Sequence, residues 1–197
     1  TSKEVLELMK GRRSIRQYSQ KDLSRETIKK CLDAARLAPS ASNLQPLEYL
    51  YIDKDEKRDK VFPLLSWAGY LGKEGDPDED KKPTGYLAVL VNQDKAKVSS
   101  EYDVGASVEN FIISTWAFGI GSCWLLSVDR QKFRKIFSIP DNYKVDCIVA
   151  LGYPNEEPEI EELEDNVEYW KDENNKLHVP KRNLDDILYI NDLNNEE

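Results

Sequence analysis

Two helices precede the first strand in the order of elements that the sequence predicts. The spacing of apolar residues predicts helices over about 3–10, 24–37, 55–67, 101–118 and 129–137. Short apolar runs predict strands over 47–52, 86–91, 123–127 and 144–151. A start with two helices favours an α+β sandwich with a mixed sheet over a doubly wound nucleotide-binding fold.

Single residues mark the ends of several predicted elements. Ser24 is expected to cap the second helix, and Pro39 to end it. Pro63 is expected to kink or divide the helix over 55–67. The helix over 101–118 has the clearest periodicity, and its Gly105 permits close approach.

Two segments lack clear helical or strand spacing. Residues 69–85 are rich in Gly, Pro, Asp and Lys, and we expect a mobile surface excursion there. The acidic run at 156–165 is typical of a solvated surface segment. Because apolar anchors follow this run, we expect the C-terminal arm to wrap around a partner subunit rather than to be disordered. These anchors are Trp170, Leu177, Val179, Leu184, Ile187 and Leu188.

Composition limits the chemistry that the chain can perform. Its 197 residues suffice for one domain, and a net charge of −9 argues against nonspecific nucleic-acid binding. The single histidine, His178, excludes a His-rich metal site, so in an enzyme we expect a bound cofactor rather than a metal to carry the chemistry. The three cysteines form no CxxC pair, which suggests a reducing compartment. No apolar run approaches a membrane span and the first residues lack the order of a secretory signal, so we expect a cytoplasmic protein.

A basic cluster follows the first predicted helix. Arg12, Arg13, Ser14 and Arg16 lie in an aperiodic stretch. Three guanidiniums and a hydroxyl suit an anionic ligand such as phosphate. In an acidic protein the same arginines can pair with nearby acids instead, and the residues alone leave both interpretations open.

A polar loop bracketed by prolines follows the second predicted helix. Between Pro39 and Pro46 lie two hydroxyls and two amides, those of Ser40, Ser42, Asn43 and Gln45. Such a loop either lines the polar edge of a ligand or forms a simple turn, and the basic pair Lys181–Arg182 is equally ambiguous. Gly119-Ile120-Gly121 follows a helix and lacks the third glycine of a dinucleotide fingerprint.

The order of five motifs along the chain resembles the nitroreductase superfamily. The motifs are Arg12-Arg13-Ser14-Ile15-Arg16, Ala38 to Pro46, Gly119 to Trp124, Ala150 to Pro154, and Lys181 to Ile187. The resemblance implies a single domain over 1–197, a three-layer α+β sandwich whose mixed, mainly antiparallel sheet is flanked by helices. An extended C-terminal arm would occupy about 155–197. The excursion at about 69–85 would correspond to the region that varies most in the family and shapes the substrate pocket.

The same resemblance implies FMN as cofactor, bound at the interface of a homodimer that has the helix 101–118 at its core. Arg12 and Ser14 would hold the phosphate and ribityl end. Arg13 would contribute largely its backbone, and Arg16 would reach the pyrimidine side of the ring as electrostatic support.

Further segments would complete this cofactor site. Lys181 and Arg182 would add to the phosphate end. The other subunit would supply Pro39, Ser40, Ser42 and Asn43. Backbone around the ring would come from Trp124, Leu125 and Leu126.

The function implied by the resemblance is an FMN-dependent oxidoreductase without a catalytic side chain of its own. NADH or NADPH would reduce the flavin by hydride transfer and leave, and a nitroaromatic, a quinone or a similar small acceptor would then take its place. One alternative is a flavin-binding sensor or carrier that does not turn over NAD(P)H. A member of the family that dehalogenates its substrate or fragments the flavin is another.

Overall fold

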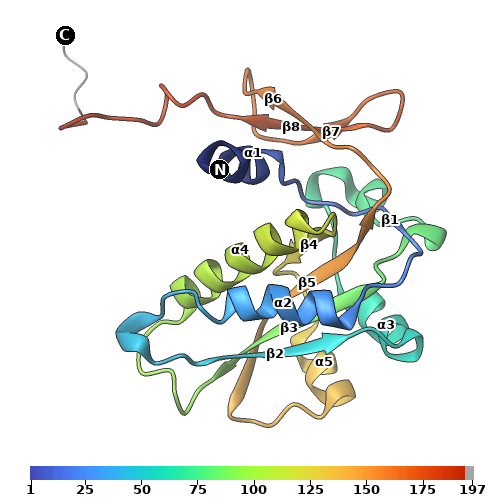
Figure 1. Cartoon of the computed structure of the whole chain (residues 1–197). Helices are drawn as coiled ribbons and strands as arrows, with labels where there is room; N and C mark the ends of the chain where they lie inside the picture. Colours follow the sequence, from blue (N-terminus) through green and yellow to red (C-terminus); the bar gives the residue numbers. More distant parts are fainter. Residues whose placement is uncertain (194–197) are drawn as a thin grey trace. The chain divides into compact units, whose positions relative to one another are not determined.

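The computed structural model describes residues 1–193 and separates the chain into two compact units, the first being Thr1–Glu156 and the second beginning at Glu157. The first unit is built on a five-stranded antiparallel sheet with the order β1-β5-β3-β2, and β4 pairs with β5 (Figure 1). Its strands are β1 (Tyr18–Ser19), β2 (Leu47–Ile52), β3 (Gly85–Asn92), β4 (Gly121–Leu125) and β5 (Tyr143–Pro154). The long strand β5 therefore pairs with β1, β3 and β4.

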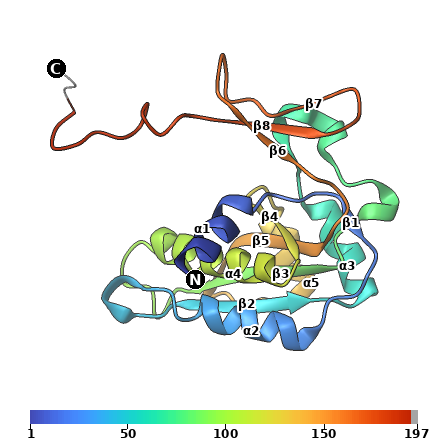
Figure 2. The same cartoon turned by 45° about the horizontal axis from the view of Figure 1, so that its top comes forward.

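Helices cover both faces of this sheet. The α-helices are α1 (Ser2–Gly11), α2 (Arg25–Ala35), α3 (Asp55–Val61), α4 (Glu101–Ala117) and α5 (Arg130–Phe137). Short 3-10 helices are η1 (Ala41–Asn43), η2 (Phe62–Leu64), η3 (Gly69–Gly75) and η4 (Glu79–Lys81). Helices α2 and α4 pack side by side (Figures 1 and 2). No helix within residues 1–193 has the length and apolar character needed to cross a membrane.

Alternate residues of β3 face the two halves of the hydrophobic core, and every residue of this strand is buried. Its odd-numbered apolar residues pack in a cluster that includes Ile28 of α2 and Val108 of α4. Its even-numbered apolar residues pack in a second cluster with Val61 of α3 and Phe133 of α5. The predicted three-layer, mainly antiparallel α+β sandwich is confirmed. Within residues 1–193, parallel pairing is confined to two strands of the second unit and to one bridge, between Ser14 and Ser122.

Most predicted elements are confirmed, with ends shifted by a few residues. Strand β2 has the predicted bounds, and Ser24 caps α2, its hydroxyl accepting a hydrogen bond from Thr27 N at 3.4 Å. Pro63 divides the third predicted helix into α3 and η2. The prediction that Pro39 ends the second helix is wrong, because α2 ends at Ala35 and the next residues tighten into shorter turns.

The excursion at 69–85 contains regular structure that the sequence did not predict. It forms η3 and η4, and Gly85 already belongs to β3. Gly75 is buried, and a Cβ built on it would lie 2.4 Å from the Cβ of Ala68. The excursion therefore includes two short 3-10 helices and a closely packed glycine. Its mobility stays a prediction.

The second unit contains a three-stranded sheet with the order β6-β8-β7, formed by β6 (Glu159–Glu162), β7 (Trp170–Lys171) and β8 (Leu177–Lys181). His178 stacks on Trp170 with ring centroids 4.3 Å apart. Glu161 accepts a hydrogen bond from Trp170 Nε1 at 2.7 Å and lies 3.2 Å from His178 Nδ1. Part of the acidic run at 156–165 is thus bonded into a sheet instead of being only solvated. That the arm wraps around a partner subunit, and that 1–197 is one domain, stay predictions.

Candidate functional site

Residues 12–17, here called the arginine segment, lie beside strand β4. Ser14 forms a parallel bridge with Ser122, and Ile15 N donates a hydrogen bond to Ser122 O at 2.9 Å. The chain then enters β1, where Tyr18 pairs with Pro154 of β5. Backbone pairing therefore holds the arginine segment on the sheet at its middle and directly after its last residue.

Two glycines allow this close approach. Gly121 of β4 and Gly152 of β5 are register partners. A Cβ on Gly121 would lie 2.7 Å from Ile15 Cγ1, and a Cβ on Gly152 would lie 2.7 Å from Tyr18 Cδ1. The side chains of Ile15 and Tyr18 fill this glycine slot and are 1% and 0% exposed. Any residue with a Cβ at either position would push the arginine segment away from the sheet.

The carboxylate of Glu156 is a further attachment of the arginine segment. Glu156 Oε1 accepts hydrogen bonds from the backbone N–H groups of Arg16 and Gln17, the second at 3.1 Å. The Gln17 side chain in turn bonds the excursion: its Oε1 accepts from Asp78 N at 3.2 Å, and its Nε2 donates to Asp76 O at 3.4 Å. Sequence reasoning missed Gln17 and assigned Glu156 to a solvated run. The residues that they bond, Asp78 and Arg16 respectively, lie far away from them in the sequence.

The side chains of the segment have distinct environments. Arg12 is 27% exposed, and its Nε lies 3.7 Å from Glu109 Oε1 on α4. Arg13 donates to Lys10 O at 2.6 Å and to Arg12 O at 2.7 Å, next to the C-terminal end of α1, where a cation is favourable. Burial, followed by the neighbouring Arg12, lowers the pKa of Arg13. Ser14 is exposed.

Within the arginine segment, the side chain of Arg16 interacts with Cys123 at the buried start of β4. Burial raises the pKa of the Cys123 thiol, and the neighbouring Arg16 guanidinium opposes this rise. Cys123 is 3% exposed, so Arg16 reaches into the sheet side of the site and not only into solvent.

The end of β4 presents apolar surface next to the arginine segment. Trp124 is 36% exposed and Leu126 is 61% exposed, while Leu125 between them is buried in the core at 6%. Trp124 and Leu125 differ because successive side chains of a strand point to opposite faces, and Leu126 follows directly after the end of β4. The chain therefore places a basic segment and exposed apolar side chains on neighbouring pieces of backbone.

Residues 40–45 form a second candidate element, here called the left-handed loop. Three non-glycine residues have positive φ angles: 51° at Ser42, 55° at Asn43 and 49° at Gln45. Ala41 N donates a hydrogen bond to Asp103 Oδ1 at 3.0 Å, so the loop is attached to the first turn of α4. Ser42 and Asn43 are exposed.

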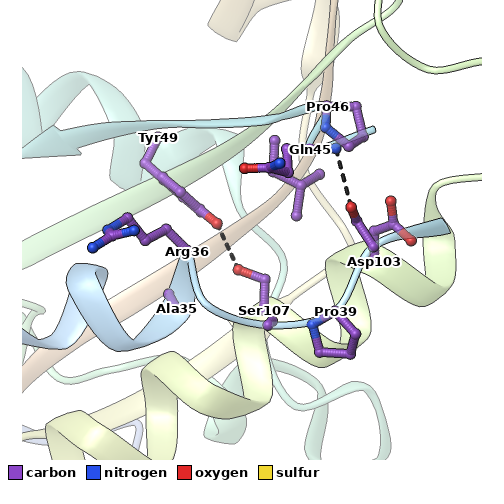
Figure 3. Close-up of a pocket in the computed structure, with 11 residues that line it drawn as sticks. Ala35, Arg36, Pro39, Gln45, Pro46, Tyr49, Asp103 and Ser107 are labelled. Carbon is purple, nitrogen blue, oxygen red and sulfur yellow. Dashed lines mark hydrogen bonds between the residues drawn. The ribbon is translucent and has the colours of Figure 1, made fainter. Parts of the chain in front are cut away.

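A pocket of about 150 Å³ opens beneath this loop (Figure 3). Tyr49 of β2 bonds Ser107 of α4 across it, with 2.6 Å between the two hydroxyl oxygens. Burial raises the pKa of Tyr49, and the bond to Ser107 opposes the rise. Pro39 and Asp103 also line the pocket.

The structure brings some of the predicted site residues together within one chain. Arg12 to Arg16 lie beside β4, which leads to Trp124 and Leu126. The left-handed loop contacts α4 at Asp103, whereas the arginine segment contacts that helix further along, at Glu109. Lys181 and Arg182 belong to the second unit, where Arg182 Nη2 donates to Asp186 O at 2.7 Å. Their place at a phosphate site stays a prediction.

Comparison with known proteins identifies the family. The nitroreductase family model matches residues 9–153. A relative from Archaeoglobus fulgidus, named as a candidate NADH dehydrogenase/NAD(P)H nitroreductase, is 33% identical over 171 residues, which cover 82% of this chain and 92% of the relative. The solved structure of an FMN-dependent nitroreductase from Clostridium difficile R20291 is 25% identical with a TM-score of 0.66, covering 77% of this chain and 88% of that one.

A second solved structure extends the likeness in fold over nearly the whole chain. The nitroreductase family protein from Streptococcus pneumoniae TIGR4 superposes with a TM-score of 0.69 at 18% identity, covering 94% of this chain and 98% of that one. The family model alone spans most of the first unit, including the arginine segment, the left-handed loop and β4. This chain belongs to the nitroreductase family.

Proposed function

We propose that this protein is an FMN-dependent oxidoreductase that takes electrons from NADH or NADPH and passes them to a small acceptor such as a nitroaromatic or a quinone. The observation that carries the proposal is the bridge between Ser14 and Ser122, which sets a partly exposed basic segment beside the apolar end of β4. FMN combines a phosphate with a flat, largely apolar ring. The names of the relatives, which mention NAD(P)H and FMN, support the same cofactor and reductant.

The donor set of the arginine segment fits a phosphate. The contact of Arg12 with Glu109 is long and partly exposed, so it costs little to exchange for a phosphate oxygen. Ser14 offers an exposed hydroxyl as a further donor. Because the Arg13 side chain is bonded to backbone carbonyls, Arg13 would contribute through its backbone.

When bound, FMN supplies the two-electron redox chemistry that side chains lack. The guanidinium of Arg16 would stabilise negative charge on the pyrimidine side of the ring. This help is electrostatic, so the site requires no side chain that gains or loses a proton. Trp124 and Leu126 would exclude water from the apolar part of the ring.

The proposal includes a homodimer in which each cofactor contacts both subunits. Ser42 and Asn43 are exposed on a loop that is attached to α4 at a different place from Arg12. Such a loop is available to the cofactor of a second copy. Pro39, Ser40, Ser42 and Asn43 would then come from one subunit, and the arginine segment from the other.

The visible spectrum tests the proposed activity. Purified protein incubated with FMN should be yellow after removal of free flavin, and anaerobic NADH or NADPH should bleach it. Protein that stays colourless would contradict the proposal. A bound flavin that neither reductant bleaches would favour a sensor or carrier instead. If the flavin is bleached, product analysis with a panel of acceptors would separate a nitroreductase or quinone reductase from a dehalogenating or flavin-fragmenting enzyme.

Mixed dimers test the shared site. A dimer that carries Arg12→Ala in one subunit and Asn43→Ala in the other should have one intact site and one doubly damaged site. Half of the sites should therefore bind FMN with wild-type affinity. If each subunit built its own site, every site in the mixed dimer would be damaged and no wild-type fraction would appear in the titration.

A further inference from the structure

The left-handed loop is attached to the helical layer through a buried carboxylate. Asp103 is 5% exposed, yet it lies on the first turn of α4, where carboxylates are usually solvated. Its Oδ1 accepts a hydrogen bond from Ala41 N at 3.0 Å. Ala41 is the first residue of η1, so the bond fixes the point at which the loop starts to turn. A carboxylate forms a stronger bond with a backbone N–H than a neutral acceptor does.

The loop needs such an anchor because its backbone is unfavourable on its own. Ser42, Asn43 and Gln45 lie in the left-handed region, which residues with a Cβ rarely adopt. Bonds inside the loop, from Gln45 N to Ser40 Oγ at 3.0 Å and from Asn43 N to Ser40 O at 3.0 Å, close it upon itself. They do not set where the loop lies relative to α4, whereas the bond to Asp103 does.

The next turn of α4 holds the strand that leaves the loop. Ser107 lies four residues after Asp103, on the same face of the helix, and is 2% exposed. Its hydroxyl bonds Tyr49 of β2 at 2.6 Å (Figure 3). Two buried polar groups of one helix therefore hold the loop and its following strand, and both line the pocket between them.

We propose that Asp103 is a positioning residue whose carboxylate holds the left-handed loop in the conformation that presents Ser42 and Asn43 to the FMN of the partner subunit. This inference rests on the proposed function. Asp103 does not touch the cofactor in this scheme. Its effect on affinity passes entirely through the backbone of Ala41 and the residues that follow.

The first measurement is amide hydrogen exchange of the full chain without cofactor. Asp103→Ala should speed exchange in a peptide that covers residues 40–45 by about tenfold or more, because the loop loses a charge-assisted bond. Asp103→Asn keeps an acceptor oxygen and should restore most of the protection. Glu101→Ala is the matched control, because it removes an acid from the same helical turn that bonds Ser99 instead of the loop.

The second measurement is FMN affinity, titrated by flavin fluorescence with the same four proteins. Asp103→Ala should weaken binding about tenfold, whereas Asp103→Asn and Glu101→Ala should stay within about twofold of wild type. Sedimentation should show the same dimer for all variants. If Asp103→Ala does not fold, Asp103→Ser replaces it, since serine is accepted near a helix start but is too short to reach Ala41 N.

The outcomes separate the inference from the proposed function. Wild-type exchange and wild-type affinity in Asp103→Ala or Asp103→Ser would overturn the inference while leaving the proposed function intact. Faster exchange with unchanged affinity would also overturn it, because the loop would then be anchored by Asp103 without serving FMN. If the wild-type protein itself does not bind FMN, the proposed function fails, and with it the role of the loop toward flavin.

Discussion

The arginine segment and the left-handed loop are both aperiodic stretches, but the protein holds them in different ways. The segment is bonded to the sheet through its own backbone, at Ser122 and in β1. The loop has residues with positive φ angles and is bonded to α4 by the side chain of Asp103. The segment is thus supported both by backbone pairing and by the Glu156 carboxylate, whereas the contact of the loop with α4 depends on the side chain of Asp103.

This difference predicts where single substitutions have an effect. In the arginine segment, side chains such as Arg12 and Ser14 can change with little loss of structure, because the backbone carries the attachment. In the left-handed loop, a substitution on a different element, at Asp103, changes the local backbone. The substitutions below test this contrast in order of decreasing expected effect.

Arg12→Ala should weaken FMN binding by about 1.5–3 kcal/mol, because a charged hydrogen bond to phosphate is lost while the backbone stays in place. The unfolding midpoint in urea should change little. Arg25→Ala is the control, since Arg25 is an exposed arginine that pairs with Asp53 away from the segment. Wild-type FMN affinity in Arg12→Ala would show that this arginine serves only as an ion-pair partner of Glu109.

Gly121→Ala should lower the free energy of unfolding by about 1–3 kcal/mol, because its Cβ would lie 2.7 Å from Ile15 Cγ1. Urea denaturation measures this change. Gly69→Ala serves as the matched control, since a Cβ at Gly69 meets nothing within 4 Å. Equal stabilities of the two variants would mean that the arginine segment is not packed into the glycine slot.

Glu156→Ala should cost about 1–2 kcal/mol of unfolding free energy, because two backbone N–H groups lose a carboxylate acceptor in a partly solvated place. Glu156→Gln should recover part of this loss. Glu157→Ala changes the neighbouring exposed acid and should have almost no effect. A loss in Glu157→Ala as large as in Glu156→Ala would point to overall charge instead of the two hydrogen bonds.

Ser42→Gly should raise the free energy of unfolding of the cofactor-free protein by about 0.5–1 kcal/mol, because glycine accepts a φ of 51° without a Cβ penalty. Asn43→Gly should raise it less, since asparagine tolerates the left-handed region better than serine. Thermal unfolding of both variants measures the difference. A destabilised Ser42→Gly would show that the loop carries no backbone strain.

The sequence predicted the elements of this fold better than the supports of its site. The periodicity of α4 and the apolar run of β2 are local signals, and both elements lie where they were expected. Asp103, Gln17 and Glu156 were missed. Each of them bonds a backbone N–H far away in the sequence. Asp103 bonds Ala41, 62 residues away, Gln17 bonds Asp78, 61 residues away, and Glu156 bonds Arg16, 140 residues away. No local sequence pattern indicates such pairs.

Glycines illustrate the same limit. The sequence argued against a dinucleotide fingerprint at Gly119 and Gly121, but it did not predict what these glycines do in the structure. Gly119 has a φ of 72° just after α4, and Gly121 makes room for Ile15. Only the register of β4 on β5 shows that Gly121 and Gly152 form one slot.

The glycine slot also determines the order in which the arginine segment and the sheet can come apart. Ile15 and Tyr18 enter a slot that exists only after β4 and β5 have paired, so the segment cannot dock on an unformed sheet. Strands β4 and β5, in contrast, stay paired through their own backbone hydrogen bonds when the segment detaches. The arginine segment is therefore expected to detach at a lower free energy than the sheet unfolds, so that the site can open for cofactor while β4 and β5 stay paired.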